Sequence, residues 1–367
     1  MNRSLIHPRV RAAAVLAAVA VGVTVLAGCG GSSDVTSNSS TAAAGSGSAT
    51  GSGSAAGGGS GPQLALVAYS TPKKAFDALT AAFEQSPTGK GVSFTQSFGA
   101  SGSQSRAVAT GLPADVVEFS TTPDITRLVK AGIVSSTWDA NAEQGISSDS
   151  VVVFVVRKGN PKQISGWDDL IKPGVDVITP NPSTSGSARW NILAGYGAEL
   201  KEGKTPAQAL AYLNTLLTKN VSVQPSSASA ALQTFTGGKG DVLLDYESDA
   251  LAAVKAGDAV QVVYPAQTIL IQTPIAVTAK SAHAAQGQAF VNWQWSPAGQ
   301  TIWAKEGYRP VLASVAGRFA SKFPTPPQLF TISYLGGWTK VDTTLFAPST
   351  GSVTKIEEAA GVPTASS

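Results

Sequence analysis

The chain has 367 residues, of which 13% are charged and 43% hydrophobic, with 38 glycines and 21 prolines. This composition predicts many short elements joined by turns, in two or three domains, and excludes a coiled coil or a membrane bundle. The formal charge of +3 lies near the N-terminus: residues 1–28 hold three arginines and no acid, which leaves 23 basic and 23 acidic residues. Net charge therefore gives no reason to expect nucleic acid as a partner.

The N-terminal segment has the pattern of a lipoprotein signal peptide. Its three arginines precede an apolar run over 12–28, which ends Leu-Ala-Gly just before Cys29. The run is shorter than the ~20 residues that a membrane-spanning helix needs. We therefore predict that residues 1–28 are removed, that Cys29 carries a lipid, and that the protein is anchored to the outer face of the cytoplasmic membrane. The alternative is an uncleaved membrane anchor.

Residues 29–62 comprise this cysteine and a predicted flexible linker. The part after Cys29 contains ten glycines, ten serines and a single charge at Asp34. Such a composition cannot bury enough apolar surface to offset its chain entropy. A linker of this length has a root-mean-square span of about 30 Å, which would let the folded part reach a membrane partner.

The side-chain inventory excludes several kinds of catalytic site. Cys29 is the only cysteine, and His7 and His283 are the only histidines. Because His7 lies in the predicted signal peptide, one histidine and one lipidated cysteine remain, too few for a zinc site, a Cys–His dyad or a two-histidine metal motif. We expect no enzyme activity, no metal and no cofactor.

From residue 64 onward, short apolar runs alternate with helical patterns, which predicts an α/β architecture with mainly parallel sheets. Helices are expected over 73–85 and 206–218, where apolar residues recur at helical spacing. Strands are expected over 64–68, 92–98, 115–119, 151–156, 175–178, 221–223, 241–244 and 275–278.

Two of these segments are predicted to cross between two lobes. The run 151–156 is continuously apolar, as expected of a buried strand that leaves one lobe, and 272–278 could return to it. The predicted first lobe is 63–154 plus 275–367, and the second is 155–274. A ligand cleft is expected between them.

Small and hydroxyl side chains follow most of the predicted strands, at the edge where open α/β sheets bind ligands. Serine, threonine and asparagine are also ordinary helix caps, so one strand end followed by such residues does not by itself indicate a ligand site. Several helix N-termini that converge would form an anion site without any lysine or arginine, because each presents unpaired N–H groups and a partial positive charge.

Two segments resemble the signatures of a known family. Asn-Pro-Ser-Thr-Ser-Gly-Ser-Ala-Arg-Trp-Asn over 181–191 is similar to the N-P-x-x-S-G-x-A-R/K-W-N pattern of prokaryotic sulfate-binding proteins of ABC importers. Gln-Ser-Phe-Gly-Ala-Ser-Gly over 96–102 resembles their second pattern, Q-S-x-G-x-S-G. Further similarities extend from residue 64 to about residue 356.

The resemblance implies a two-lobed type II periplasmic-binding-protein fold with two mainly parallel sheets, which closes over dehydrated sulfate and delivers it to an ABC permease. It implies neutral donors from both lobes, with Gly102 and Arg189 behind them, in a protein expected to be a monomer. The direct ligands that it implies are the N–H groups of Ser70, Ser101, Ser185, Gly186, Ser187 and Ala228, the hydroxyl of Ser185, and the side chain of Tyr246.

Two of these positions depart from the common family pattern, since Ser70 stands where an acid is frequent and Tyr246 where a tryptophan often donates. Hydrogen phosphate would need an acceptor such as Asp245, but strand alternation predicts that Asp245 faces away from Tyr246 and the anion. Thiosulfate and phosphate stay open as alternative ligands. An ester hydrolase on the same scaffold and a lipoprotein that has lost its ligand are the alternative functions.

Overall fold

The computed structural model describes residues 61–364. The predicted signal peptide, Cys29 and nearly all of the linker lie outside these residues. None of the described helices combines the length and the apolar character needed to cross a bilayer.

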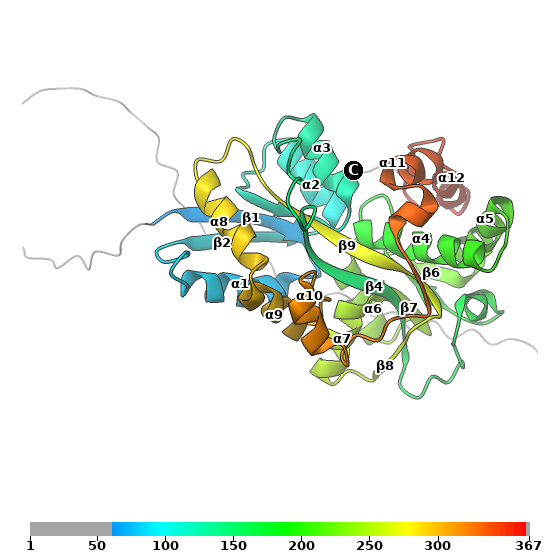
Figure 1. Cartoon of the computed structure of the whole chain (residues 1–367). Coiled ribbons are helices and arrows are strands. Elements are labelled where there is room, and N and C mark those ends of the chain that lie inside the picture. Colours follow the sequence, from blue (N-terminus) through cyan, green and yellow to red (C-terminus); the bar gives the residue numbers. More distant parts are fainter. Residues whose placement is uncertain (1–60, 365–367) are drawn as a thin grey trace, which may run out of the picture. The chain divides into compact units, whose positions relative to one another are not determined.

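Two long strands, β4 (Ile146–Arg157) and β9 (Gln267–Val277), connect two lobes (Figure 1). The first half of β4 pairs antiparallel with β9, and its second half pairs with strands of the second lobe. The last residues of β9 pair with a strand of the first lobe. One mixed sheet therefore runs through both lobes in the order β2-β1-β3-β9-β4-β7-β5-β6.

This topology refines the predicted pair of mainly parallel sheets. Within each lobe the strands β1, β2, β3 and β5, β6, β7 pair in parallel, as predicted. All antiparallel pairings among the described strands involve β4 or β9. The crossing strands are longer than predicted, because their polar ends pair with the neighbouring strand although they lack a continuous apolar pattern.

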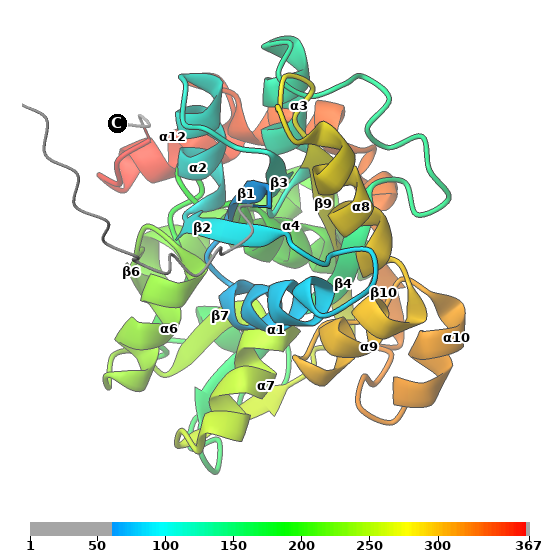
Figure 2. The same ribbon diagram turned by 90° about the vertical axis from the view of Figure 1, so that its left-hand side faces the viewer.

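In the first lobe, helices cover both faces of the sheet (Figure 2). Leu66 packs with α1, α8 and α9 on one face, while the next residue, Val67, packs with α2 and α3 on the other, as strand alternation requires. The elements of this lobe are β1 (Gln63–Tyr69), α1 (Lys73–Glu84), β2 (Ser93–Gly99), α2 (Ser101–Ala109), β3 (Val116–Glu118), α3 (Thr122–Lys130), α8 (Ala284–Gln294), α9 (Pro297–Lys305) and α10 (Ala313–Ala316).

The second lobe has the same layered arrangement. Val152, Phe154 and Val156 of β4 face a core with α4 and α5, and Val153 and Val155 face α6 and α7. The elements of this lobe are β5 (Val177–Ile178), α4 (Gly186–Lys201), α5 (Pro206–Thr215), β6 (Val221–Val223), α6 (Ala228–Thr236), β7 (Val242–Tyr246), α7 (Glu247–Ala256) and β8 (Val260–Val263).

The C-terminal segment differs from the predicted division into lobes, which assigned residues 275–367 to the first lobe. It contains β10 (Gln328–Phe330), α11 (Trp338–Val341), a π-helical turn (Asp342–Phe346) and α12 (Ser352–Ala359). Its apolar side chains join the core of the second lobe, because β10 pairs with the early part of β9. The other predicted boundaries between the two lobes remain predictions.

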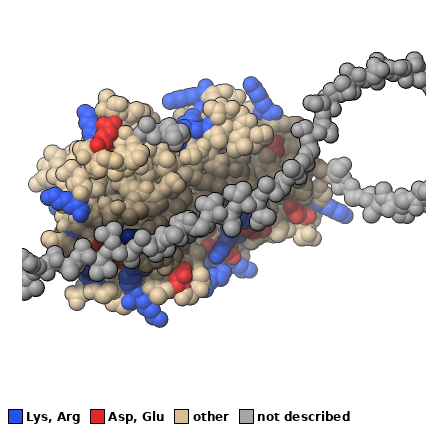
Figure 3. All heavy atoms as spheres, turned by 180° about the vertical axis from the view of Figure 1, so that it is seen from behind, with Lys and Arg blue, Asp and Glu red and all other residues tan. Residues whose placement is uncertain are grey.

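Charged side chains are spread over the surface. Figure 3 shows one face on which Lys, Arg, Asp and Glu lie scattered around the margin and most of the surface between them is uncharged. This distribution agrees with the balanced charge outside residues 1–28 and does not form a broad basic patch on that face.

Candidate anion-binding site

The two lobes touch at the ends of their strands, and we call this contact the seam. It consists of Gly102 and Ser120 from the first lobe and Thr184, Gly186 and Tyr246 from the second. The N–H of Gly102 donates to the carbonyl of Thr184 at 3.1 Å, and the hydroxyls of Ser120 and Tyr246 lie 2.6 Å apart. Three of the predicted site positions, Gly102, Gly186 and Tyr246, are thus in the seam, and Ser101, Ser185 and Ser187 are their neighbours in the chain.

Glycine at position 186 permits this close approach. A Cβ atom on Gly186 would lie 2.7 Å from Ser120 Oγ and 2.9 Å from Thr121 Cγ2, both in the opposite lobe. Real Cβ atoms do not come so near, so a larger residue would separate the lobes at this point. The glycine of the Ser-Gly-Ser motif is therefore required by packing between lobes.

Three helix N-termini meet around Thr184. The carbonyl of this residue accepts from Gly102 in the first turn of α2, and its hydroxyl donates to the carbonyl of Ser226 at 2.8 Å, just before α6 begins. Thr184 itself immediately precedes the N-cap of α4, Ser185. Helix N-termini carry unpaired N–H groups and about half a positive charge each, so this arrangement favours an anion.

Buried hydroxyl groups add donors at the seam. Ser185 Oγ and Ser187 Oγ lie 2.7 Å apart, and Ser120 Oγ and Tyr246 Oη form a similar pair. Each pair shares one hydrogen bond, which leaves one further hydroxyl proton in each pair for an acceptor. Burial raises the pKa of Tyr246 well above its usual range, so its hydroxyl keeps its proton at neutral pH.

In the first lobe, the side chain of Ser101 is fixed by a hydrogen bond to Asp124. Ser101 Oγ donates to Asp124 Oδ2 at 2.6 Å and accepts from the N–H of Ser120 at 2.9 Å. Asp124 is itself held by Arg127, whose Nη1 lies 2.8 Å from Oδ1. This network fixes the start of α2 and leaves the backbone N–H of Ser101 in the first helical turn.

The other predicted ligands differ in burial and in their position at the helix starts. Gly186, Ser187 and Ala228 lie in the first turns of α4 and α6 and are buried. Ser70 is partly exposed in the loop after β1, before α1 begins. The N–H of Ser185 was predicted to bind the anion, but in the structure it donates to the carbonyl of Asn181 at 2.9 Å, because residues 181–185 form a turn.

Arg189 lies near the start of α4 and bonds to partners outside the two hydroxyl pairs. Its Nε donates to the carbonyl of Pro182 at 3.1 Å, and its Nη1 lies 2.8 Å from Asp342 Oδ1. These bonds hold the loop that leads into α4. The expectation that Arg189 acts behind the direct ligands remains a prediction.

The alternation predicted for Asp245 is confirmed by the register of β7. Tyr246 lies opposite Val152 and Asp245 opposite Val153, and these two valines face different cores. Asp245 instead contacts Asp249 of α7, which accepts from Thr71 Oγ1 across the lobes at 2.9 Å. Burial, and then the neighbouring charge of Asp249, raise the pKa of Asp245 well above its usual range.

Ser120 is a site residue that the sequence analysis missed. Besides its contact with Tyr246, it accepts from Trp190 Nε1 through its carbonyl at 2.7 Å and is completely buried. It directly follows the strand predicted over 115–119. Ligands of open α/β sheets bind at the carboxyl ends of strands, and the same rule applied to this strand predicts Ser120 as a site residue.

An acidic trio elsewhere could hold a cation on residue type alone. It consists of Asp168, Glu199 and Glu202, whose carboxylate oxygens lie within 4.8 Å of one another. Lys204 occupies the same position, with its Nζ 2.8 Å from Glu199 and 3.2 Å from Glu202. The ammonium group of Lys204 pairs with all three carboxylates where a cation would bind, so the cluster carries no metal assignment.

Comparison with known proteins identifies the family. Residues 64–309 match the family described as bacterial extracellular solute-binding protein. The chain belongs to this family. Its relatives include the sulfate-binding protein of Synechococcus elongatus, 39% identical over 81% of this chain and 87% of the relative. The resemblance to prokaryotic sulfate-binding proteins is thus confirmed.

Other relatives of this solute-binding protein differ in the ligand named for them. The thiosulfate-binding protein of Escherichia coli is 33% identical over 79% of this chain and 89% of the relative. Among solved structures, the sulfate-binding protein SubI from Mycobacterium tuberculosis H37Rv is 48% identical and matches with a TM-score of 0.75 over 77% of this chain and 98% of SubI. The type II periplasmic-binding-protein fold is therefore confirmed.

Proposed function

We propose that this solute-binding protein captures sulfate at the seam and delivers it to an ABC permease. The observation that carries the proposal is the meeting of three helix N-termini, from both lobes, around Thr184. The proposed direct ligands are the N–H groups of Ser70, Ser101, Gly186, Ser187 and Ala228 and the hydroxyls of Ser185 and Tyr246.

Neutral donors suit sulfate for a chemical reason. Near neutral pH sulfate carries no proton, so all of its hydrogen bonds are accepted. Hydrogen phosphate must also donate a proton, and in a site made of donors that proton would have no acceptor. The position of Asp245 supports this discrimination, because it lies on the opposite face of β7 from Tyr246.

Equilibrium dialysis of labelled sulfate against the full-length chain tests the proposal. We expect saturable binding, and Ser185→Ala should weaken it by about 1–3 kcal/mol because a charged partner loses a donor. The matched control is Ser183→Ala, on the same loop but outside the Ser185–Ser187 hydroxyl pair. Absence of saturable binding below millimolar sulfate would refute the function, and unchanged affinity in Ser185→Ala would refute the site.

Thiosulfate is the second candidate ligand, because the E. coli relative is named for it. It shares the charge of sulfate, but one terminal sulfur replaces an oxygen and accepts hydrogen bonds less well. A competition series of sulfate, thiosulfate, molybdate and phosphate at two pH values ranks the ligands. Stronger competition by thiosulfate than by unlabelled sulfate would reverse the assignment.

We also propose that the mature protein is a monomer anchored through lipid on Cys29, with residues 30–62 as its tether. The support is the small-residue pair before Cys29 and the Gly/Ser composition that follows it. Labelled fatty acid should be incorporated into the wild-type chain and not into Cys29→Ser. Equal incorporation into both would contradict the anchor.

A further inference from the structure

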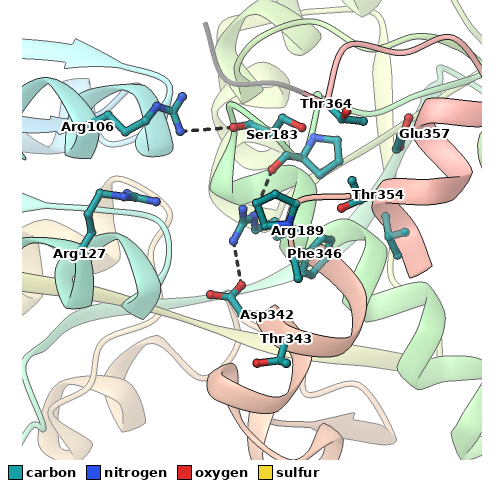
Figure 4. Close-up of a pocket in the computed structure, with 14 residues that line it drawn as sticks. Arg106, Arg127, Ser183, Arg189, Asp342, Thr343, Phe346, Thr354, Glu357 and Thr364 are labelled. Carbon is teal, nitrogen blue, oxygen red and sulfur yellow. Dashed lines mark hydrogen bonds and ion pairs between the residues drawn. The ribbon is translucent and has the colours of Figure 1, made fainter. Parts of the chain in front are cut away.

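A cavity of about 500 Å³ lies beside the seam, and we call it the vestibule (Figure 4). Three arginines line it: Arg106 from α2, Arg127 from α3 and Arg189 from α4. Asp342 and Glu357 of the C-terminal segment complete its charged lining. The sequence gives no sign of this cluster, since the arginines are distant in the chain.

The arginines retain donors that a ligand could use. Each guanidinium has five N–H donors, and each makes two hydrogen bonds to the part of the chain that the structure describes. Figure 4 shows Arg106 and Arg127 reaching from the first lobe toward the wall that carries Arg189 and Asp342. Guanidinium donors from both lobes therefore line one shared cavity.

Positive charge exceeds negative charge on this lining. Asp342 pairs with Arg189, and Asp124, outside the lining, pairs with Arg127, so Arg106 is the lining arginine with no ion pair to the residues that the structure describes. Burial raises the pKa of Glu357 to about 7, so this acid is only partly ionised at neutral pH. The arginines also act on one another: burial and then the neighbouring Arg127 lower the pKa of Arg106. An anion among them would relieve this repulsion.

The vestibule takes its present form only when the lobes touch. Arg106 and Arg127 belong to the first lobe, whereas the rest of the charged lining packs with the second lobe. Arg106 Nη1 lies 3.5 Å from the carbonyl of Ser183 across the seam. A ligand bound here would therefore favour the closed arrangement, and linkage requires that closure favour the ligand.

We propose that the vestibule is a second anion site, which binds a small dianion with two or more anionic oxygens and thereby strengthens ligand binding at the seam. The coupling rests on the proposed sulfate function, whereas binding at the vestibule does not. The cavity has room for an organic dianion as well as for an inorganic one.

Calorimetric titration with ethane-1,2-disulfonate tests the site, because this dianion does not titrate near neutral pH and is too long to replace sulfate among the donors of the seam. Sulfate is present at the lowest concentration that saturates the seam, because sulfate is itself a small dianion and would compete for the vestibule at higher concentrations. We expect one disulfonate per full-length chain. Arg106→Gln should weaken its binding roughly tenfold by removing a charged donor, and Asp342→Asn should strengthen it severalfold by removing a negative charge.

Arg318→Gln is the matched control, because Arg318 is an exposed arginine outside the vestibule. The two lining variants change binding in opposite directions, so a folding defect in one does not remove the test. Absence of saturable binding, equal affinity in the wild type and both lining variants, or displacement of labelled sulfate by the disulfonate would each overturn the second site.

The coupling is measured by dialysis of labelled sulfate with and without the disulfonate. We expect sulfate affinity to rise about threefold or more when the vestibule is occupied, and this rise should disappear in Arg106→Gln. An unchanged sulfate affinity would overturn the coupling. If sulfate fails to bind while disulfonate binding depends on Arg106, the proposed sulfate function fails and the vestibule stands.

Discussion

The seam and the vestibule are adjacent, yet they are suited to anions by different means. At the seam the donors are neutral: helix N-termini and hydroxyls buried between the lobes. In the vestibule they are guanidinium groups, and Arg127 and Arg189 remain partly exposed. Oriented dipoles select by geometry and by the absence of acceptors, whereas guanidinium charges attract any small anion and are screened by salt. We therefore expect specificity at the seam and tolerance in the vestibule.

The largest expected effect comes from blocking the seam. Gly186→Val should weaken sulfate binding roughly 30- to 100-fold, from about 2–3 kcal/mol of overpacking, because its side chain would clash with Ser120. Gly317→Ala is the control, since Gly317 has open surroundings and a helical φ of −57°. Small-angle scattering should show compaction by sulfate in the control and not in Gly186→Val. Equal compaction in both would contradict the packing of the seam.

The next largest effect is the salt dependence of binding, which should be strong in the vestibule and weak at the seam. Raising NaCl to ~0.5 M shortens the screening length to a few ångströms, so disulfonate binding in the vestibule should fall about tenfold. Sulfate binding at the seam should change less than about threefold, because its donors are buried and uncharged. Calorimetry at low and high salt measures both. A parallel loss at the two sites would mean that net charge, and not oriented donors, holds sulfate.

Removing a single hydroxyl from the seam should have a smaller effect. Tyr246→Phe removes one donor next to Ser120 and should weaken sulfate binding about three- to tenfold, the usual net value of one hydrogen bond. Tyr334→Phe, at an exposed tyrosine, should leave affinity unchanged. If Tyr246→Phe matches this control in dialysis, Tyr246 does not donate to the anion.

The smallest effect concerns pH in the vestibule. The pKa of Glu357 is about 7 because of burial, so this group becomes negative as pH rises from 6 to 8. The other charged groups of the lining are Arg106, Arg127, Arg189 and Asp342. Disulfonate binding should therefore weaken roughly two- to fivefold over this range, and Glu357→Gln should remove the dependence. The same slope in Glu357→Gln would assign the dependence to another group.

Local features of the molecule could be predicted from the sequence. The apolar run 151–156 and the Ser-Gly-Ser motif carry their own periodicity and composition, and the structure has a crossing strand and a helix start at these positions. Ser120 was overlooked although it follows a predicted strand. The turn that engages the N–H of Ser185 was not foreseen, because its acceptor is a backbone carbonyl that no side-chain pattern marks.

Long-range features could not be predicted in this way. The C-terminal segment packs on the second lobe through β10, a strand of three residues that carries no detectable alternation of its own. The vestibule brings together arginines separated by up to 83 positions and an acid a further 153 positions along the chain. Only the assembled fold determines which distant charges become neighbours.

An anomalous difference map from crystals of the full-length chain grown with selenate tests the central claim most directly. Selenate has the charge and tetrahedral shape of sulfate, and its selenium marks the position of the anion. We predict the strongest peak at the seam, within hydrogen-bond distance of Ser185, Ser187 or Tyr246. A peak confined to the vestibule, among Arg106, Arg127 and Arg189, would contradict the claim that neutral donors of both lobes hold the anion.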